Sequence, residues 1–309
     1  MKAINVVGLE KSYGANKVLK GVDLEVDEGE LYALMGPNGS GKTTLSSIIA
    51  SVTDFDAGTV DIYGKKPAYA RRMIGYVPQD NFSSPLLSAR ENLMYFAGLL
   101  GYSGRSARVI VRDLLEKVGL SGDARKRVGR FSGGMRKRLE IATALFPGIK
   151  VLILDEPTTG LDPSARRDFF SLLQKIKDHN TSIFLITHIG SDAELANRVG
   201  LIEKGRIVAQ GTPDALRRAY ATDDVITVEL PVKNAEIAAL LKTFSPEKPV
   251  VESIGGYRLY SPDGGRLIPN IIRQLDLVGY KVSRIELARP SLEDVFYKVT
   301  EQNITEVAA

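Results

Sequence analysis

The sequence of 309 residues has no cysteine, and its histidines number two, His179 and His188. The lack of cysteine excludes disulfide bonds, thiolate metal sites and a cysteine nucleophile, and it is typical of a reducing compartment such as the cytosol. Long apolar runs are also missing, since none reaches the roughly eighteen residues that a membrane-spanning helix requires. The opening stretch MKAINVVGLEKSYG is typical of a β-strand and not of a signal peptide. We therefore expect a globular protein without a membrane span of its own, with His179 in a loop.

Positive charge is concentrated in one segment of the chain. The whole sequence has a formal net charge of +4, whereas residues 101–140 hold 11 lysines and arginines against 4 acidic residues. This surplus has two interpretations, which the sequence leaves open. It is either a solvated helical face or a surface that lies near the phosphates of a nucleotide, a lipid headgroup or a nucleic acid.

Strands and helices alternate through the first two thirds of the chain. The stretches INVVGL, VLKGVDLEV, LYALM and DAGTVDIYGKK are predicted to be short strands separated by turns. The apolar runs VLIL and SIFLIT are typical of strands buried on both faces, as in a parallel sheet. Apolar residues recur at helical spacing in 111–118 and 169–176, and Asp162 followed by Pro163 indicates a helix start. This order predicts a wound α/β domain over residues 1–220.

The pattern changes from about residue 224. Strand, helix, two strands, helix and strand follow one another, an order that is typical of a small ferredoxin-like unit. Ser291 and Asp294 have the spacing of a capping box, so a last helix is expected to begin there. We therefore expect a small α+β accessory domain over residues 224–309.

A phosphate-binding loop is the strongest motif in the sequence. GPNGSGKTT follows the strand LYALM and fits G-x-x-x-x-G-K-[ST], and TTLSSIIA can continue as a helix. The glycines let backbone N–H groups surround phosphate oxygens, and the helix dipole adds positive potential. Lys42 is predicted to reach the β- and γ-phosphates of a nucleoside triphosphate, and the Thr43 hydroxyl to bind Mg²⁺. The residues expected to contact the nucleotide are Gly36, Pro37, Asn38, Gly39, Ser40, Gly41, Lys42, Thr43 and Thr44.

Two acids and a histidine lie where two of the buried strands end. VLILDEP places Asp155 and Glu156 after one strand, and IFLITH places His188 after another. Ligands of open α/β sheets bind at the carboxyl ends of the strands. On this interpretation Asp155 holds Mg²⁺, Glu156 polarises the attacking water and His188 contacts the γ-phosphate. Two solvated acids and a structural histidine are the alternatives that the residues leave open.

A second anion site is predicted downstream of the first. In RFSGGMRKRLE, Ser132, Gly133 and Gly134 open a helix whose first turn carries three cations, an arrangement that suits an anion. Those cations either support the anion or form a partly solvated helix face. Together with the phosphate loop and the LILDE strand, the segment makes residues 2–218 resemble the ATP-binding subunit of an ABC transporter. FSGGM matches the family signature, usually LSGGQ, with methionine in place of glutamine.

The resemblance implies a fold and further site residues. The fold is a P-loop NTPase ABC cassette: a wound mixed sheet with an N-terminal antiparallel β subdomain and a helical subdomain at about residues 80–135. Tyr13 falls where the family stacks an aromatic ring on adenine, and Gln79 falls at the Q-loop, which contacts Mg²⁺. TTGLD matches the D-loop with Asp162, and His188 matches the H-loop. Surface packing for Tyr13 and a plain polar loop for Gln79 remain the alternatives.

The resemblance also explains why one chain has two anion loops. In the family, two subunits, copies or homologues, meet head to tail with two ATP molecules between them. Ser132 and the amides of Gly133 and Gly134 then cap the γ-phosphate that is held by Lys42 of the opposite subunit. Hydrolysis removes this shared anion and weakens the dimer.

A membrane partner is implied as well. Because the chain has no span of its own, transport requires a separate membrane-embedded permease, whose coupling helix would bind at NFSSPLLSARENLMYFAGLLGY. The tail ARPSLEDVFYKVT resembles that of the ATPases of type-2 ABC exporters, the drug-resistance kind. The function expected is therefore ATP hydrolysis that powers export, by a peripheral subunit at the cytoplasmic face of the cell membrane.

The alternative is a soluble ABC ATPase that acts on nucleic acid or on the ribosome. Ribosome-associated members carry two cassettes, whereas this chain has one signature. Chromosome-maintenance ATPases insert a long coiled coil between phosphate loop and signature, and the short gap here has no sustained heptads. The basic segment 101–140 lacks the interleaved aromatics that stack on bases, so no nucleic-acid partner is expected.

Overall fold

A computed structural model describes residues 1–178, 180–220, 223–253 and 255–307, so that His179 lies outside the described residues. The chain divides into two compact units, Met1–Pro213 and Asp214–Ala309. Each unit is a fold in its own right, and the sites of interest lie in the first.

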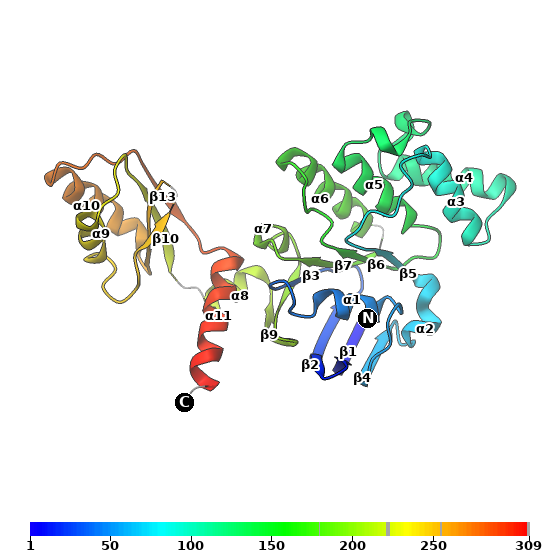
Figure 1. Ribbon diagram of the computed structural model, residues 1–309, viewed down its shortest axis with the longest axis horizontal. Helices are drawn as coiled ribbons and strands as arrows, with labels where there is room; N and C mark the ends of the chain where they lie inside the picture. The colour runs from blue at the N-terminus through cyan, green and yellow to red at the C-terminus, as the bar shows by residue number, and fades with distance from the viewer. Residues whose placement is uncertain (179, 221–222, 254, 308–309) are drawn as a thin grey trace. The chain divides into compact units, whose positions relative to one another are not determined.

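The first unit is built on a six-stranded mixed sheet (Figure 1). Neighbouring strands are parallel except for the last pair, which forms a hairpin that turns at Lys204-Gly205. In sheet order the strands are β5 (Ile74–Val77), β6 (Val151–Asp155), β7 (Ser182–Thr187), β3 (Leu31–Met35), β8 (Arg198–Glu203) and β9 (Arg206–Gly211). Every residue of β3, β6 and β7 is buried, which confirms the interpretation of the purely apolar runs.

A three-stranded antiparallel sheet lies below the main sheet in Figure 1. The short strands expected near the N-terminus are instead two twelve-residue strands, which accommodate their length through several register shifts. In sheet order the strands are β2 (Asn16–Asp27), β1 (Lys2–Tyr13) and β4 (Ala57–Ile62). Between the two sheets lies α1 (Lys42–Ile49), which buries Leu45, Ile48 and Ile49 in their common core.

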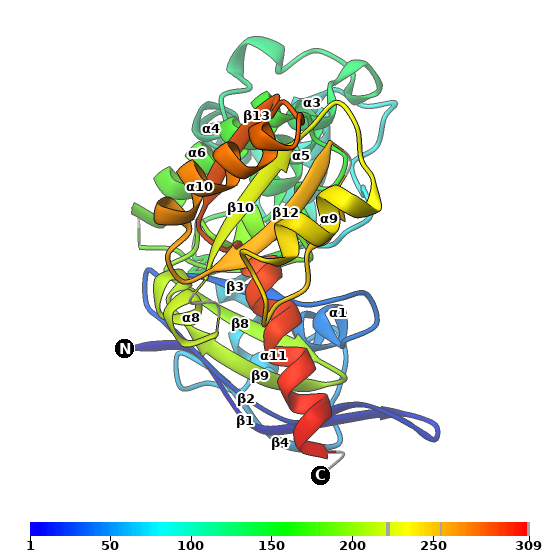
Figure 2. The same cartoon turned by 90° about the vertical axis from the view of Figure 1, so that its left-hand side faces the viewer.

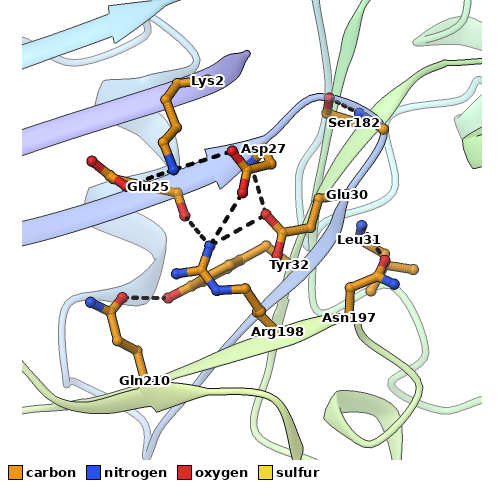
Figure 3. Close-up of polar contacts among 11 residues, drawn as sticks. Lys2, Glu25, Asp27, Glu30, Leu31, Tyr32, Ser182, Asn197, Arg198 and Gln210 are labelled. Atoms are coloured by element: carbon orange, nitrogen blue, oxygen red, sulfur yellow. Dashed lines mark hydrogen bonds and ion pairs between the residues drawn. The ribbon is translucent and has the colours of Figure 1, made fainter.

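Polar contacts around Arg198 join the two sheets (Figure 3). From the start of β8, its guanidinium donates to the carbonyl oxygen of Glu25 at 3.3 Å and lies 3.6 Å from Glu30 and 3.9 Å from Asp27. Burial raises the pKa of Glu30, and the backbone N–H of Asp27 and the charge of Arg198 oppose that rise. One cation therefore fixes the end of β2 against β8, beside the strand that leads to the phosphate loop.

The helices on the other side of the main sheet include the segment expected to be the helical subdomain. Figures 1 and 2 place α5 and α6 across the main sheet from α1. Ser88 caps α3 in a full capping box with Glu91, and Asp162 caps α6 as expected, accepting from the N–H groups of Ser164 at 2.9 Å and Ala165 at 3.0 Å. Besides α1, the helices of the first unit are α2 (Pro67–Ala70), which lies beside β4, α3 (Ala89–Leu99), α4 (Gly104–Lys117), α5 (Gly133–Thr143), α6 (Pro163–Asp178) and α7 (Gly190–Ala193).

The second unit has the expected β-α-β-β-α-β order (Figure 2). Its four antiparallel strands lie in the order β11-β12-β10-β13, with α9 and α10 packed on one face around a core of their own. Ser291 and Asp294 form the expected capping box. The elements are α8 (Pro213–Tyr220), β10 (Asp224–Glu229), α9 (Ala235–Lys242), β11 (Val251–Ser253), β12 (Gly256–Ser261), α10 (Gly264–Leu277), β13 (Arg284–Ala288) and α11 (Leu292–Val307).

Among the described residues, no helix combines the length and the apolar character that crossing a membrane requires.

Candidate functional site

Four neighbouring strands of the main sheet point their carboxyl ends at the same edge. Because β5, β6, β7 and β3 are parallel, the residues that follow them gather there. The phosphate loop follows β3, Gln79 follows β5, Glu156 follows β6 and His188 follows β7. The sheet topology therefore collects residues that are far apart in the sequence.

The phosphate loop is held close to the sheet by its two outer glycines. A Cβ on Gly36 would lie 2.2 Å from the carbonyl oxygen of Ile202, so no side chain fits there. Gly41 has φ +104°, a conformation that other residues rarely adopt, and α1 begins at the next residue. Within the described part of the chain, the buried hydroxyl of Ser40 has no hydrogen-bond partner. A buried donor without a partner, at the start of a helix, suits a phosphate oxygen.

Lys42 turns back into its own loop. Its ammonium donates to the carbonyl oxygens of Gly36 and Pro37, both at 2.8 Å, and lies 4.0 Å from a carboxylate oxygen of Glu156. Burial lowers the pKa of Lys42, whereas the charges of Glu156 and Asp155 act in the opposite direction. The ammonium is thus held over the loop by two neutral acceptors, which a phosphate can replace.

Asp155 has an exposed fraction of 0%, and neither oxygen of its carboxylate has a hydrogen-bond partner among the residues that the structure describes. Burial raises the pKa of Asp155, and the nearby Thr43 hydroxyl opposes that rise. A buried carboxylate beside a hydroxyl is a hard oxygen donor set of the kind that Mg²⁺ prefers. The residues therefore fit the metal ion that the motif implies.

Glu156 lies at the centre of the site and makes three contacts. His188 Nδ1 lies 3.2 Å from one carboxylate oxygen, which is also the oxygen nearest Lys42, and Gln79 Nε2 donates to the other at 3.3 Å. The backbone of Glu156 has φ 46°, in the left-handed region. Such a conformation costs a non-glycine residue of order 1–3 kcal/mol and is found at functional sites. Gln79, Lys42, Glu156 and His188 are thus brought together as the sequence predicted.

The other expected residues lie apart from this cluster. Ser132 is exposed and caps α5, accepting from the N–H of Met135 at 3.3 Å. Tyr13 ends β1 with 52% of its surface exposed, beneath the ammonium of Lys11. In the part of the chain that the structure describes, no hydrogen bond or ion pair joins Tyr13, Ser132 or Asp162 to Glu156. One chain therefore does not bring its two anion loops together, because α1 and α5 lie on opposite sides of the sheet (Figures 1 and 2).

Lys137, one of the three cations that follow the signature, has a role that the sequence did not indicate. Lys137 is buried: its ammonium donates to the carbonyl oxygen of Gln79 at 3.3 Å and pairs with Glu140 at 3.3 Å. Ser83 donates to the other oxygen of Glu140 at 3.4 Å, and burial raises the pKa of this acid. The signature helix is thereby tied to the segment 79–83. The i, i+3 spacing of lysine and glutamate was the signal available in the sequence.

The sequence also contains no indication that Asp192, which is fully buried on α7, has a structural role. Its carboxylate accepts hydrogen bonds from the Thr158 hydroxyl, from Arg166 Nε at 2.5 Å and from the Thr187 hydroxyl at 3.3 Å. Thr158 lies in the TTGLD segment, and Thr187 directly precedes His188. Asp192 therefore fixes both segments to one buried charge. No local motif indicates this role, because its partners come from three elements.

Comparisons with known proteins agree with this geometry. Residues 19–159 match the family model described as ABC transporter, and residues 211–300 match the model described as "ATP-binding protein DrrA1-3-like, C-terminal domain". The "Daunorubicin resistance ATP-binding protein DrrA2" of Streptomyces coeruleorubidus is 35% identical over 96% of this chain and 95% of its own. The "Nod factor export ATP-binding protein I" of Burkholderia orbicola is 40% identical over 73% of this chain and 76% of its own.

Solved structures give the same result. A structure described as the ATP binding subunit of an ABC transporter aligns with a TM-score of 0.62 and 31% identity, over 70% of this chain and 92% of its own. The dimeric post-hydrolysis state of the cassette MJ0796, bound to ADP and Pi, aligns with a TM-score of 0.61 and 28% identity, over 68% of this chain and 98% of its own.

The phosphate loop, the strand-end acids and the cassette fold define an ATP-binding subunit of an ABC transporter, and the chain belongs to that family. It is an ATPase whose hydrolysis is coupled to transport. Its C-terminal domain is of the DrrA1-3-like kind, which confirms the resemblance to type-2 exporter ATPases.

Replacement by asparagine should change the stability of the protein in opposite directions at two buried aspartates, Asp155 and Asp192. We expect Asp155→Asn to raise the stability of the nucleotide-free protein by roughly 1–2 kcal/mol, because it removes a carboxylate charge that burial disfavours. Asp192→Asn should lower stability by about 2 kcal/mol, because it breaks a satisfied ionic network. Denaturant unfolding measures both changes.

The dependence of stability on pH provides a further check on Asp155, because burial raises the pKa of its carboxyl group. The cost of keeping Asp155 buried is complete above that raised pKa and disappears as the pH falls from it to the ordinary value of 3.8, so the advantage of Asp155→Asn should shrink over that interval. The exposed Asp168 on α6 is the control, since Asp168→Asn should change stability by less than about 0.5 kcal/mol. A loss of stability in Asp155→Asn at neutral pH would contradict the assignment of an unpartnered carboxylate.

Proposed function

We propose that Glu156 is the general base of ATP hydrolysis in this subunit and that it orients the attacking water. The observation that carries the proposal is the geometry of its carboxylate, which faces Lys42, Gln79 and His188 at 4.0 Å or less. On ATP binding, the ammonium of Lys42 exchanges its loop carbonyls for the β- and γ-phosphates. His188 and Gln79 then hold the γ-phosphate and the water in line with the carboxylate.

The metal proposed for this site is Mg²⁺, held by Asp155, Thr43 and Gln79. When bound, the ion neutralises charge on the phosphates and orients them. The unpartnered carboxylate of Asp155 supports this proposal, because a buried acid needs either a proton or a cation. The backbone of the phosphate loop surrounds the phosphates, and the residues proposed to contact them are Gly36, Pro37, Asn38, Gly39, Ser40, Gly41, Lys42, Thr43 and Thr44.

The active unit proposed is a head-to-tail dimer with a second copy or a homologous subunit. Ser132 and the amides of Gly133 and Gly134 would cap the γ-phosphate that is bound by the opposite subunit. Asp162 would lie at the interface between the two subunits, and Tyr13 would stack on adenine. The exposed position of Ser132, across the sheet from α1, supports an external target. The dimeric post-hydrolysis state of the cassette MJ0796 supports the same arrangement.

The partner proposed for the helical subdomain is a separate membrane-embedded permease, which places the subunit at the cytoplasmic face of the cell membrane. Tyr95 and Leu99 lie one turn apart on α3 with 60% and 65% of their surfaces exposed. Nearby in the sequence, Leu100 and Tyr102 line a hollow of about 320 Å³ together with Phe146. An exposed apolar surface beside an apolar hollow is typical of a protein interface.

Export is the direction proposed for transport. The relatives named for drug resistance and for Nod factor export support it, as does the C-terminal domain that the drug-resistance relatives share. Action on nucleic acid or on the ribosome gains no support from these relatives.

Substitution of the proposed base tests the hydrolytic role. Glu156→Gln should retain ATP binding, lose turnover by about a hundredfold or more, and accumulate a nucleotide-bound dimer, because the amide cannot accept the proton of water. Phosphate release and gel filtration with ATP measure both effects. The exposed Glu116, changed to glutamine, is the control. Turnover close to wild type in Glu156→Gln would remove Glu156 from this role.

Mixed subunits test the shared site. Lys42→Ala disables the phosphate loop and Ser132→Arg disables the signature, so neither homodimer contains an intact site. A heterodimer of the two contains one intact pairing, and we expect the mixture to bind ATP more tightly than either variant alone. An equal mixture that gains nothing over its components, in a titration with a fluorescent ATP analogue, would show that the two loops do not act across subunits.

The apolar surface on α3 predicts the site of membrane attachment. Replacing both Tyr95 and Leu99 with serine should reduce binding of the purified subunit to native membranes several-fold, because the apolar contact is lost. The ATPase activity of the free subunit should not change. As a control, Tyr69 and Leu195, which are 81% and 57% exposed elsewhere on the same unit, are replaced in the same way. Equal binding by both double variants would place the contact elsewhere.

A further inference from the structure

The ATP site leaves most of the positive charge of residues 101–140 without a role. In the structure, part of this charge surrounds one hollow of about 360 Å³ between α3, α4 and the turn after α4. We call it the arginine hollow, because four of its nine lining residues are arginines and none is acidic. Its lining consists of Arg90, Arg105, Arg108, Val109, Val111, Arg112, Leu115, Ser121 and Ala124.

The helices α3 and α4 fix the backbone positions of the four arginines, whose side chains are exposed. Arg105, Arg108 and Arg112 follow one another at spacings of three and four on α4, so they share one face of that helix. Arg90 comes from the first turn of α3, and its backbone N–H donates to the carbonyl oxygen of Ala124 at 2.9 Å. That bond ties the start of α3 to the far wall of the hollow. The floor is rigid as well, because Val111 and Leu115 belong to the core.

The arginines of the hollow are short of counter-charges. Arg112 pairs with Asp113 at 3.0 Å, whereas the described contacts include no ion pair of Arg90, Arg105 or Arg108. Two acids that are near in sequence are engaged elsewhere, since Glu91 is held by Ser88 and Asp123 lies 3.4 Å from Lys126, whereas the exposed Glu116 follows Arg112 by one turn of α4. Like charges that face a common space repel one another, and a bound anion removes that repulsion.

We propose that the arginine hollow binds an anion with at least two negative charges on phosphate groups. Guanidinium groups bind phosphate oxygens in pairs, and several of them on one helix face can hold adjacent phosphates. The volume is within the range of small-ligand sites, about 300–1,000 Å³. No aromatic side chain lines the hollow, which disfavours stacked bases and therefore nucleic acid. Either an anionic lipid headgroup or a soluble polyphosphate has this chemistry.

The test compares two double variants of the full chain with the same loss of charge. Arg105→Gln with Arg108→Gln removes two charges from the hollow. Lys117→Gln with Arg125→Gln removes two exposed charges of the same region that do not line it. Glutamine has nearly the helix propensity of arginine and lysine, so all variants should fold, as circular dichroism and the thermal midpoint verify. Every protein also carries Lys42→Ala, which weakens phosphate binding at the ATP site.

Two probes distinguish the sources of the anion. Pyrophosphate, measured by calorimetry, represents a soluble polyphosphate, and phosphatidylcholine vesicles with or without cardiolipin represent a lipid with two phosphates. We expect the hollow variant to lose about tenfold in affinity for at least one probe, or about 1.4 kcal/mol, and the control variant less than about twofold. Loss for pyrophosphate alone indicates a soluble ligand, and loss for cardiolipin vesicles alone indicates a lipid.

The remaining outcomes overturn the proposal. If neither probe binds the Lys42→Ala protein, the hollow is not a phosphate site. If both double variants lose affinity equally, the binding is a general effect of positive charge and does not depend on the hollow. If the thermal midpoint changes in the hollow variant alone, the double variant Arg105→Lys with Arg108→Lys shows whether the loss of binding comes from altered folding. This variant keeps the charge and should restore binding.

Discussion

The ATP site depends on one carboxylate, that of Glu156, and on the parallel sheet that brings three other elements to it. Lys42 reaches it from α1, Gln79 from the end of β5 and His188 from the end of β7. Only a shared edge of parallel strand ends gathers segments so distant in sequence. The left-handed backbone of Glu156 and the bare carboxylate of Asp155 both cost stability in the nucleotide-free protein. Binding of nucleotide and metal can relieve the second of these costs.

Much of this site could be predicted from the sequence, because its motifs combine local backbone chemistry with buried strands. GPNGSGKTT requires glycine where the chain touches Ile202 and where φ is positive, and apolar runs locate the strand ends that carry Asp155 and His188. Strand lengths near the N-terminus could not be predicted, because register shifts keep β1 and β2 paired beyond the apolar stretches. The roles of Asp192 and Lys137 could not be predicted for a different reason. The partners of Asp192 are set by tertiary packing, and the i, i+3 spacing of Lys137 and Glu140 does not indicate the contact of Lys137 with the carbonyl oxygen of Gln79.

The arrangement of the positive charge of residues 101–140 also could not be predicted from the sequence. Sequence counts cations but cannot tell a solvated face from a convergent one, since that depends on how two helices and a turn are packed. In the structure the cations divide into different groups. Lys137 is buried against Glu140 and the Q-loop, whereas Arg90, Arg105, Arg108 and Arg112 face one hollow with a core floor. Arg105, Arg108 and Arg112 are exposed on one face of α4, as the interpretation of a solvated helix face expects, and Arg90 of α3 joins them at the hollow, whereas Lys137 is buried.

The contacts of Lys137 connect the two halves of the proposed shared site within one chain. Ser132 is exposed at the start of α5, and Lys137 in the second turn of the same helix donates to the carbonyl oxygen of Gln79, whose side chain donates to Glu156. Two hydrogen bonds therefore connect α5 to the carboxylate of Glu156 in the same chain. If the head-to-tail dimer forms, each signature that closes on a partner's nucleotide also repositions the base on its own side. The two ATP sites are then coupled by geometry, without a contact between the nucleotides.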